Sequence, residues 1–176
     1  MGKYETNYEV LPVSRRDLRG YAKYIRDSFG ITTIQFPVVE FLEVLNGFGI
    51  YSDIIADEEW DQCFGKNEHA EYNLVTHVIS IKESVYERAR RGYGRDRFTI
   101  AHEIAHAFLL DDEELKVAKV RGGQAIPLCR NPEWQADCLA GELLIPYHLC
   151  KEMSPEEIYV QCQVSFDAAK YQKSKF

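Results

Sequence analysis

The sequence lacks the long apolar run that a membrane-spanning helix requires. No stretch approaches the roughly 18 consecutive apolar residues that such a helix needs. The first ten residues are polar and lack the apolar core of a secretory signal. Internal repeats, low-complexity tracts and Ser/Gly linkers are also missing. We therefore expect no association with a membrane, and a single domain over residues 1–176.

Cysteines are too few and too widely spaced for a disulfide framework or a zinc ribbon. The chain has five of them, an odd number, and no CxxC pair. Disulfide frameworks normally use an even set, and zinc ribbons use closely paired cysteines. We expect reduced thiols, several of them buried as small apolar residues, in a reducing compartment. The predicted location is the cytoplasm.

Basic residues are outnumbered. The 21 lysines and arginines face 28 aspartates and glutamates, which gives a formal net charge of −7. An acidic protein repels phosphate backbones, so we expect no direct binding of nucleic acid. One basic concentration stands out, formed by Arg88, Arg90, Arg91, Arg95 and Arg97. We interpret it as a solvated loop in which Arg97 pairs locally; contact with an acidic substrate is the alternative.

Apolar spacing and cap residues predict helices on both sides of a small set of strands. The expected helices cover 14–29, 37–46, 97–110, 132–144, 154–161 and 165–173. The expected strands cover 49–55 and 73–82, the second as one continuous strand. Strands flanked by helices in this order indicate an α+β domain rather than a repeated βαβ array.

The predicted helix 97–110 carries the run His-Glu-Ile-Ala-His at 102–106. Residues four apart on a helix lie about 40° apart around its axis and about 6 Å apart along it. His102 and His106 therefore point the same way, which suits two nitrogen ligands of one tetrahedral zinc ion. Glu103 is rotated by about 100°, so it can reach a water beside the metal and act as a general base.

A catalytic zinc needs a third protein ligand, and the candidates are Glu133, Asp137, Glu142 and His148. Glu133 and Asp137 share one face of the predicted helix 132–144, an arrangement in which the glutamate binds the metal and the aspartate orients a metal-binding histidine. Glu142 lies about 180° around that helix, and His148 lies beyond it. We predict Glu133 as the ligand and Asp137 as its supporting carboxylate. The alternative is that both acids merely favour the positive end of the helix.

Two sequence blocks together resemble the ImmA/IrrE family of metallopeptidases. The first is Arg97-Phe-Thr-Ile-Ala-His-Glu-Ile-Ala-His106, and the second is Glu133-Trp-Gln-Ala-Asp-Cys-Leu-Ala-Gly-Glu-Leu-Leu-Ile-Pro146. The similarity covers roughly residues 50–173. Leu139, Gly141 and Cys138 depart from the residues that are commoner in the family, and these departures affect packing rather than metal ligands.

The resemblance implies a zincin-like metallopeptidase domain, in which a small β-sheet and flanking helices surround the active-site helix. By resemblance, His102, His106 and Glu133 are ligands of Zn²⁺ and Glu103 is catalytic. The N-terminal helices would cover about 14–46 and the catalytic core about 50–173.

Family members are typically intracellular proteases, and several cleave a helix-turn-helix repressor of a mobile element or a stress response. The expected function is therefore a zinc-dependent endopeptidase whose partner is a protein substrate of this kind. The alternative is a zinc-bound binding module that sequesters a repressor or toxin without cutting it. For the group that stabilises the oxyanion, the sequence leaves Tyr93, Tyr147 and His148 open.

Overall fold

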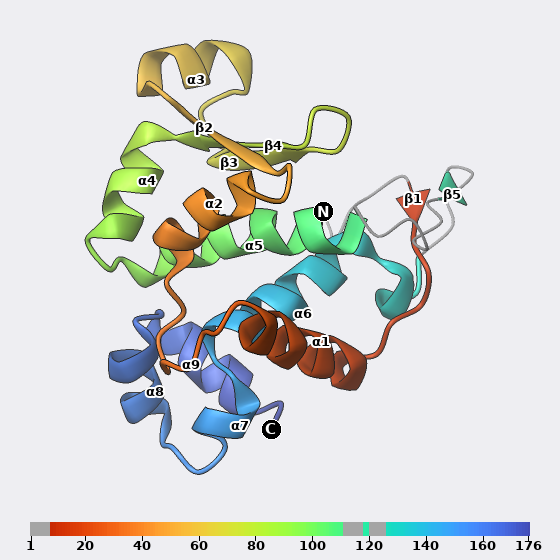
Figure 1. The fold of residues 1–176 in the computed structure, drawn as a ribbon, viewed down its shortest axis with the longest axis vertical. Helices are drawn as coiled ribbons and strands as arrows, with labels where there is room; N and C mark the ends of the chain where they lie inside the picture. Colours follow the sequence, from red (N-terminus) through yellow and green to blue (C-terminus); the bar gives the residue numbers. More distant parts are fainter. Residues whose placement is uncertain (1–7, 111–117, 120–125) are drawn as a thin grey trace.

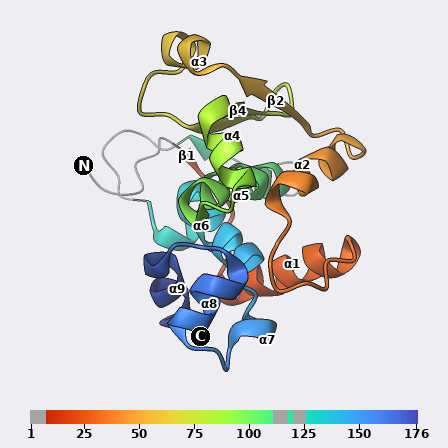
Figure 2. The ribbon, with the colours of Figure 1, turned by 90° about the vertical axis from the view of Figure 1, so that its left-hand side faces the viewer.

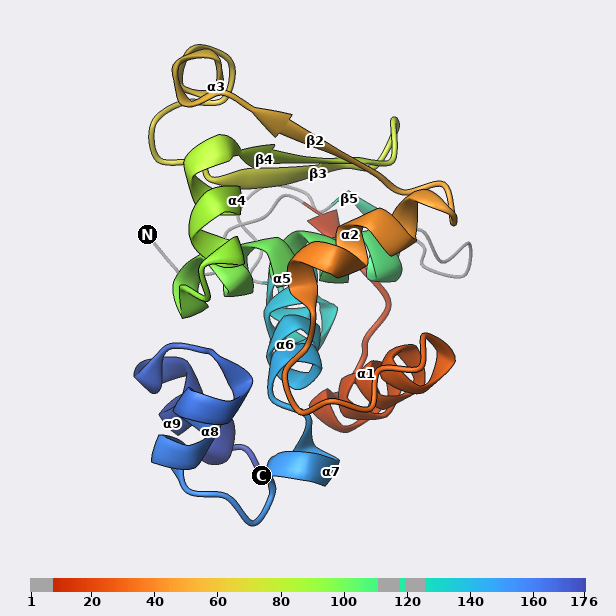
Figure 3. The same cartoon turned by 60° about the vertical axis from the view of Figure 1, so that its left-hand side comes forward.

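The computed structural model describes residues 8–110, 118–119 and 126–176 of the chain. Helix α5 (Gly94–Leu110) runs through the middle of the molecule, with a three-stranded sheet on one side and α6 (Pro132–Leu144) on the other (Figure 1). The same layering is visible when the molecule is turned, with α5 between the sheet and α6 (Figure 3). The architecture confirms the predicted α+β class.

The sheet has the strand order β2-β4-β3. Strand β2 (Tyr51–Ile55) is parallel to β4 (Val78–Lys82), and β3 (Ala70–Asn73) is antiparallel to β4. Helix α5 packs against β3 and β4. A second, two-stranded antiparallel pair joins β1 (Tyr8–Glu9) to β5 (Ala118–Lys119).

The prediction of one continuous strand over 73–82 was wrong, because a turn divides it into β3 and β4. The side chain of Asn73 accepts hydrogen bonds from the backbone N–H groups of Val75 and Thr76, each at 3.0 Å. His77 then adopts a left-handed conformation with φ of 53°. No glycine or proline marks this turn, and the apolar alternation continues across it, so the sequence pattern hid the hairpin.

Five helices lie within one residue of the predicted bounds. They are α1 (Arg15–Ser28), α2 (Val38–Asn46), α6, α8 (Pro155–Cys162) and α9 (Phe166–Lys173). Ser14 and Ser154 form capping boxes, and the side chain of Asn131 accepts from the N–H of Trp134 at 3.0 Å. These caps satisfy N–H groups that the first turn of a helix leaves unpaired, which is why the helix starts were predictable.

Four short helical elements were not predicted. They are α3 (Asp57–Cys63), α4 (Glu83–Arg90), the 3₁₀ helix η1 (Leu128–Arg130) and α7 (Tyr147–Cys150). Each has eight residues or fewer and no side chain that caps its start, so neither an apolar period nor a cap marks it. Figure 2 shows α4 beside the near end of α5, with α8 and α9 below them.

Helix α5 begins at Gly94, three residues earlier than predicted. A Cβ atom at this position would lie 2.3 Å from the backbone carbon of Val164 and 2.4 Å from the nitrogen of Ser165. Only glycine therefore allows the first turn of α5 to approach the segment that precedes α9 so closely.

The prediction that the arginine run forms a solvated loop was wrong. Arg97 is buried in α5 and donates hydrogen bonds to the backbone oxygens of Phe36 (2.7 Å) and Gln163 (3.1 Å), so it joins distant segments rather than pairing locally. Arg88 forms a two-point ion pair with Asp96, at 2.9 and 3.0 Å. The other three arginines are exposed.

The buried core surrounds α5 and α6. Ile100 and Ile104 on α5, and Leu139 and Leu143 on α6, are fully buried. All five cysteines are free thiols, and three of them are buried. In the described ranges, no helix, α5 included, combines the length and apolar character needed to cross a membrane.

Candidate metal centre

Helices α5 and α6 bring together the three predicted metal ligands. The Nε2 atoms of His102 and His106 are 3.0 Å apart. One carboxylate oxygen of Glu133 lies 3.3 Å from Nε2 of His102 and 3.4 Å from Nε2 of His106. The two histidines stand one turn apart on α5, and Glu133 stands in the first turn of α6, which packs against α5. Residues 31 positions apart in the sequence thus face one point.

The donor set and its spacing fit a small divalent cation. Ligands of a tetrahedral zinc at about 2.0–2.1 Å from the ion are separated from one another by about 3.3 Å, close to the three distances in the protein. Two imidazole nitrogens and a carboxylate oxygen also all offer lone pairs to the same point. A cation there would satisfy all three at once, whereas a single proton can serve only part of the set.

Asp137 contacts the opposite edge of the His102 ring. Its carboxylate lies 3.0 Å from Nδ1 of His102, one helical turn beyond Glu133. Burial alone would lower the pKa of His102, but hydrogen bonds to Asp137 and Glu133 outweigh it and raise this pKa to about 10. With Nδ1–H directed at Asp137, Nε2 is the atom that faces His106 and Glu133. We call the place where these three ligand atoms converge the metal point. In metal-free protein, a second proton occupies Nε2.

The environments of Glu133 and Glu103 shift their pKa values in opposite directions. Hydrogen bonds from His102 and then His106 lower the pKa of Glu133 despite its partial burial, which keeps this carboxylate charged. Burial raises the pKa of Glu103, and the charges of the two histidines offset this only in part. One oxygen of Glu103 accepts a hydrogen bond of 2.8 Å from the backbone N–H of Tyr72 in β3. The sheet thereby holds the carboxylate predicted to be the general base.

The structure separates the remaining candidates from this point. Glu142 is buried on another side of α6, where Arg19 donates to it at 3.0 and 3.1 Å. His148 and Tyr147 belong to α7. This helix follows the far end of α6, which is about 17 Å along the helix axis from Glu133. Tyr93 is exposed and precedes the start of α5, about 12 Å along the axis before His102. These positions do not support the three suggested oxyanion donors.

Two residues that sequence analysis missed interact with the glutamates of this site. The backbone of Tyr72 holds Glu103, as described above. Tyr8 is half-buried, and both this burial and the negative charge of Glu133 raise the pKa of its phenol. A backbone hydrogen bond of 3.0 Å from Val10 to Arg130 holds the segment after β1 beside the turn that precedes α6. No local pattern could indicate Tyr8, because it is far from Glu133 in the sequence and lies in a two-residue strand.

Comparison with known proteins agrees with the predicted resemblance. Residues 64–172 match the Peptidase_M78 family, described as the IrrE N-terminal-like domain. The match starts after α3 and extends into α9, so it includes both helices of the metal centre. No curated protein sequence matches the chain significantly. The matched region covers more than half of the chain, and the chain therefore belongs to the Peptidase_M78 family of IrrE N-terminal-like peptidase domains.

Proposed function

We propose that the chain is a zinc-dependent endopeptidase that uses His102, His106 and Glu133 as metal ligands and Glu103 as general base. Membership of a peptidase family supports the reaction class. The observation that carries the proposal is the convergence of two imidazoles and one carboxylate, with all three candidate ligand atoms within 4.8 Å of one another. Zinc is the metal best suited to two histidines and one glutamate with an open fourth position.

When bound, zinc at such a site lowers the pKa of water to about 7 and polarises a carbonyl oxygen. The carboxylate of Glu103 takes the proton from the attacking water and passes it to the leaving amine. Its burial suits this role, because the raised pKa lets the carboxylate hold a proton between the two steps. The backbone N–H of Tyr72 occupies one oxygen of Glu103 and leaves the other for the proton.

The remaining residues position the reacting groups. Asp137 fixes the ring of His102 so that Nε2 stays directed at the metal point. The phenol of Tyr8, whose pKa is raised by burial and by the charge of Glu133, is our candidate for the hydrogen bond that stabilises the developing oxyanion. It takes the place of the three candidates suggested by the sequence.

The proposed substrate is a regulatory protein, such as a helix-turn-helix repressor of a mobile element or a stress response. Support for this choice comes from the resemblance to ImmA/IrrE proteins in both sequence blocks around the ligands. The competing function is sequestration of a repressor or toxin by a zinc-bound module that does not cut it. The two functions differ in whether they require Glu103.

The test uses the zinc-loaded chain and a helix-turn-helix repressor encoded beside it. We expect the wild type to cut this repressor at a defined bond, and Glu103→Gln to bind zinc but to lose cleavage. Glu87→Gln, which changes a half-buried glutamate on α4 that pairs with Arg90, serves as the matched control and should cleave normally. Equal release of the repressed gene by the wild type and Glu103→Gln, without cleavage products, would favour sequestration instead.

A further inference from the structure

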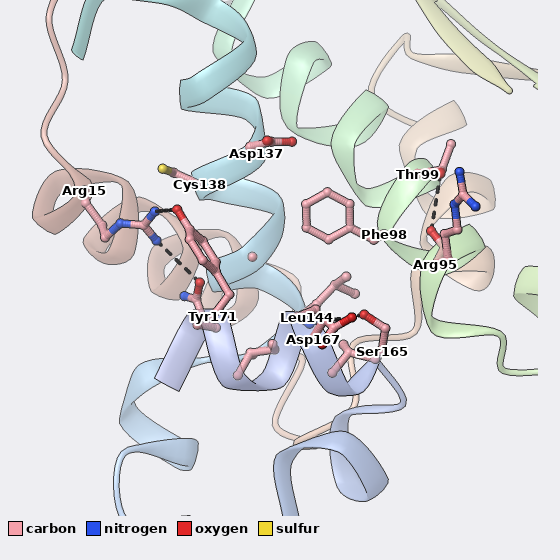
Figure 4. A pocket seen from close by; sticks show the side chains of 15 residues that line it. Arg15, Arg95, Phe98, Thr99, Asp137, Cys138, Leu144, Ser165, Asp167 and Tyr171 are labelled. Atoms are coloured by element: carbon pink, nitrogen blue, oxygen red, sulfur yellow. Dashed lines mark hydrogen bonds between the residues drawn. The ribbon is translucent and has the colours of Figure 1, made fainter. Parts of the chain in front are cut away.

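A cavity of about 540 Å³ lies between α5, α6 and α9. Its walls are largely apolar, with side chains of Phe98, Leu144, Ile145, Val164 and Ala168. Figure 4 shows Phe98 at its centre, between α5 and α6, with Leu144 below. Pockets that enclose small organic ligands typically have about 300–1,000 Å³ and mostly apolar walls. The size and lining therefore fit a small ligand with an apolar body.

The cavity is separate from the metal centre but adjoins it. Asp137 lines the cavity and also contacts His102, whereas none of the three proposed metal ligands lines it. Phe98 precedes His102 by one turn of α5, and Gly141 follows Asp137 by one turn of α6. Asp137 thus forms the wall between the two sites. A ligand in the cavity would contact the carboxylate that orients His102.

Among the residues that the structure describes, one charged side chain at the cavity has no side-chain partner. Four charged residues line it, namely Arg15, Arg95, Asp137 and Asp167. Arg15 donates to Tyr171 and Gln172, each at 3.4 Å, and lies 4.0 Å from Glu142. Asp137 contacts His102, and Asp167 pairs with Lys170 at 3.1 Å.

Arg95 differs from these three residues. Its guanidinium is exposed, and within residues 8–110, 118–119 and 126–176 it has no side-chain hydrogen bond or ion pair. In Figure 4 it lies across the cavity from Arg15. The uncompensated charge at this cavity is therefore positive, and it lies at the edge of an apolar chamber.

We propose that this cavity binds a small amphipathic anion, with its apolar body against Phe98 and Ala168 and its acidic group on Arg95. The apolar walls would supply most of the affinity, and the guanidinium would select for a negative charge. The site is distinct from peptide hydrolysis, so it does not depend on the proposed protease activity.

Two fluorescent probes with the same aromatic rings test the chemistry of the ligand. 1-Anilinonaphthalene-8-sulfonate carries a negative charge, and N-phenyl-1-naphthylamine is its neutral counterpart. We expect one saturable site per chain at neutral pH, with the sulfonate bound about ten-fold more tightly, as one charge-assisted contact would give. Arg95→Gln should remove this preference and leave the affinity for the neutral probe unchanged. Equal affinities of the wild type for both probes would overturn the proposed anion selectivity.

Cavity-filling variants test the location. Ala168→Trp should abolish binding of both probes, because the indole ring would occupy the chamber from α9. Thr99→Trp fills the cavity from α5. It replaces Ala168→Trp if that variant is not folded, as judged by the absence of a cooperative unfolding transition. The matched control is Arg91→Gln, an exposed arginine that lines a neighbouring hollow beside Tyr93 instead. Retained binding in a folded Ala168→Trp or Thr99→Trp protein, or loss of binding in Arg91→Gln, would overturn the assignment to this cavity.

Discussion

Asp137 and His102 lie 3.0 Å apart, carboxylate to Nδ1, and so connect the two helices on which the metal centre is built. The contact determines which nitrogen of His102 faces Glu133 and His106. Carboxylates in this position orient a metal-binding histidine and make it a better donor. The energetic consequence should appear in the affinity for the metal rather than in the fold.

Asp137→Asn should weaken zinc binding by about 10- to 100-fold, because the amide supports His102 less well than the carboxylate does. Competition with a fluorescent chelator measures the affinity. Asp167→Asn, an exposed aspartate on α9, is the matched control and should bind zinc as the wild type does. An unchanged affinity in Asp137→Asn would show that its contact with His102 has no part in metal binding.

Glu133→Gln should lose most bound zinc, since it removes the only negative charge among the three proposed ligands. Glu142→Gln changes the same residue type on the same helix, but the side chain faces Arg19 rather than the histidines. It should therefore retain zinc, although its thermal stability should fall. Metal analysis of both purified variants separates the two roles. The assignment of Glu133 fails if both variants retain one zinc per chain.

His102 should make the stability of metal-free protein depend on pH. Its folded-state pKa is raised from 6.5 to about 10, so the folded form binds the proton more tightly than the unfolded form. The stabilisation is complete below pH 6.5 and is lost as the pH rises through about 10. Urea unfolding of the wild type and His102→Gln, in a chelator, should show a difference that shrinks over this interval. A difference that stays constant from pH 6 to about 10 would contradict the account.

Gly94→Ala should destabilise the protein by about 1–3 kcal/mol or more, because the added Cβ meets backbone atoms of Val164 and Ser165 that cannot easily move. The control is Gly20→Ala in the middle of α1, where no atom lies within 4 Å of the added carbon. That change should stabilise by about 0.5–1 kcal/mol, since alanine favours the helix. Chemical denaturation measures both changes in the free energy of unfolding. An unchanged free energy in Gly94→Ala would show that the segment before α9 can move to accommodate the added carbon.

The local geometry of the proposed metal ligands could be predicted from the sequence because each part is encoded within one helix. The spacing of His102 and His106 places both imidazoles on one face whatever surrounds them. Asn131 and the proline after it define where α6 begins, and so which face carries Glu133 and Asp137. Only the meeting of the two helices required knowledge of the fold, and the family resemblance supplied it.

The structural features that were not predicted from the sequence depend on contacts between distant segments. The hydrogen bond from Tyr72 to Glu103 requires a hairpin that the continuous apolar alternation concealed. Tyr8 reaches the neighbourhood of Glu133 through a strand of two residues. The early start of α5 at Gly94 depends on the close approach of Val164, which no local preference signals.

In the proposed site, one metal ion is held by two imidazoles and one carboxylate from α5 and α6. Anomalous diffraction from crystals of the zinc-loaded protein at the zinc edge tests it most directly. We predict one peak per chain, about 2.0–2.2 Å from Nε2 of His102, Nε2 of His106 and a carboxylate oxygen of Glu133. A peak at other residues, or one bound by the histidines while Glu133 points elsewhere, would contradict the account.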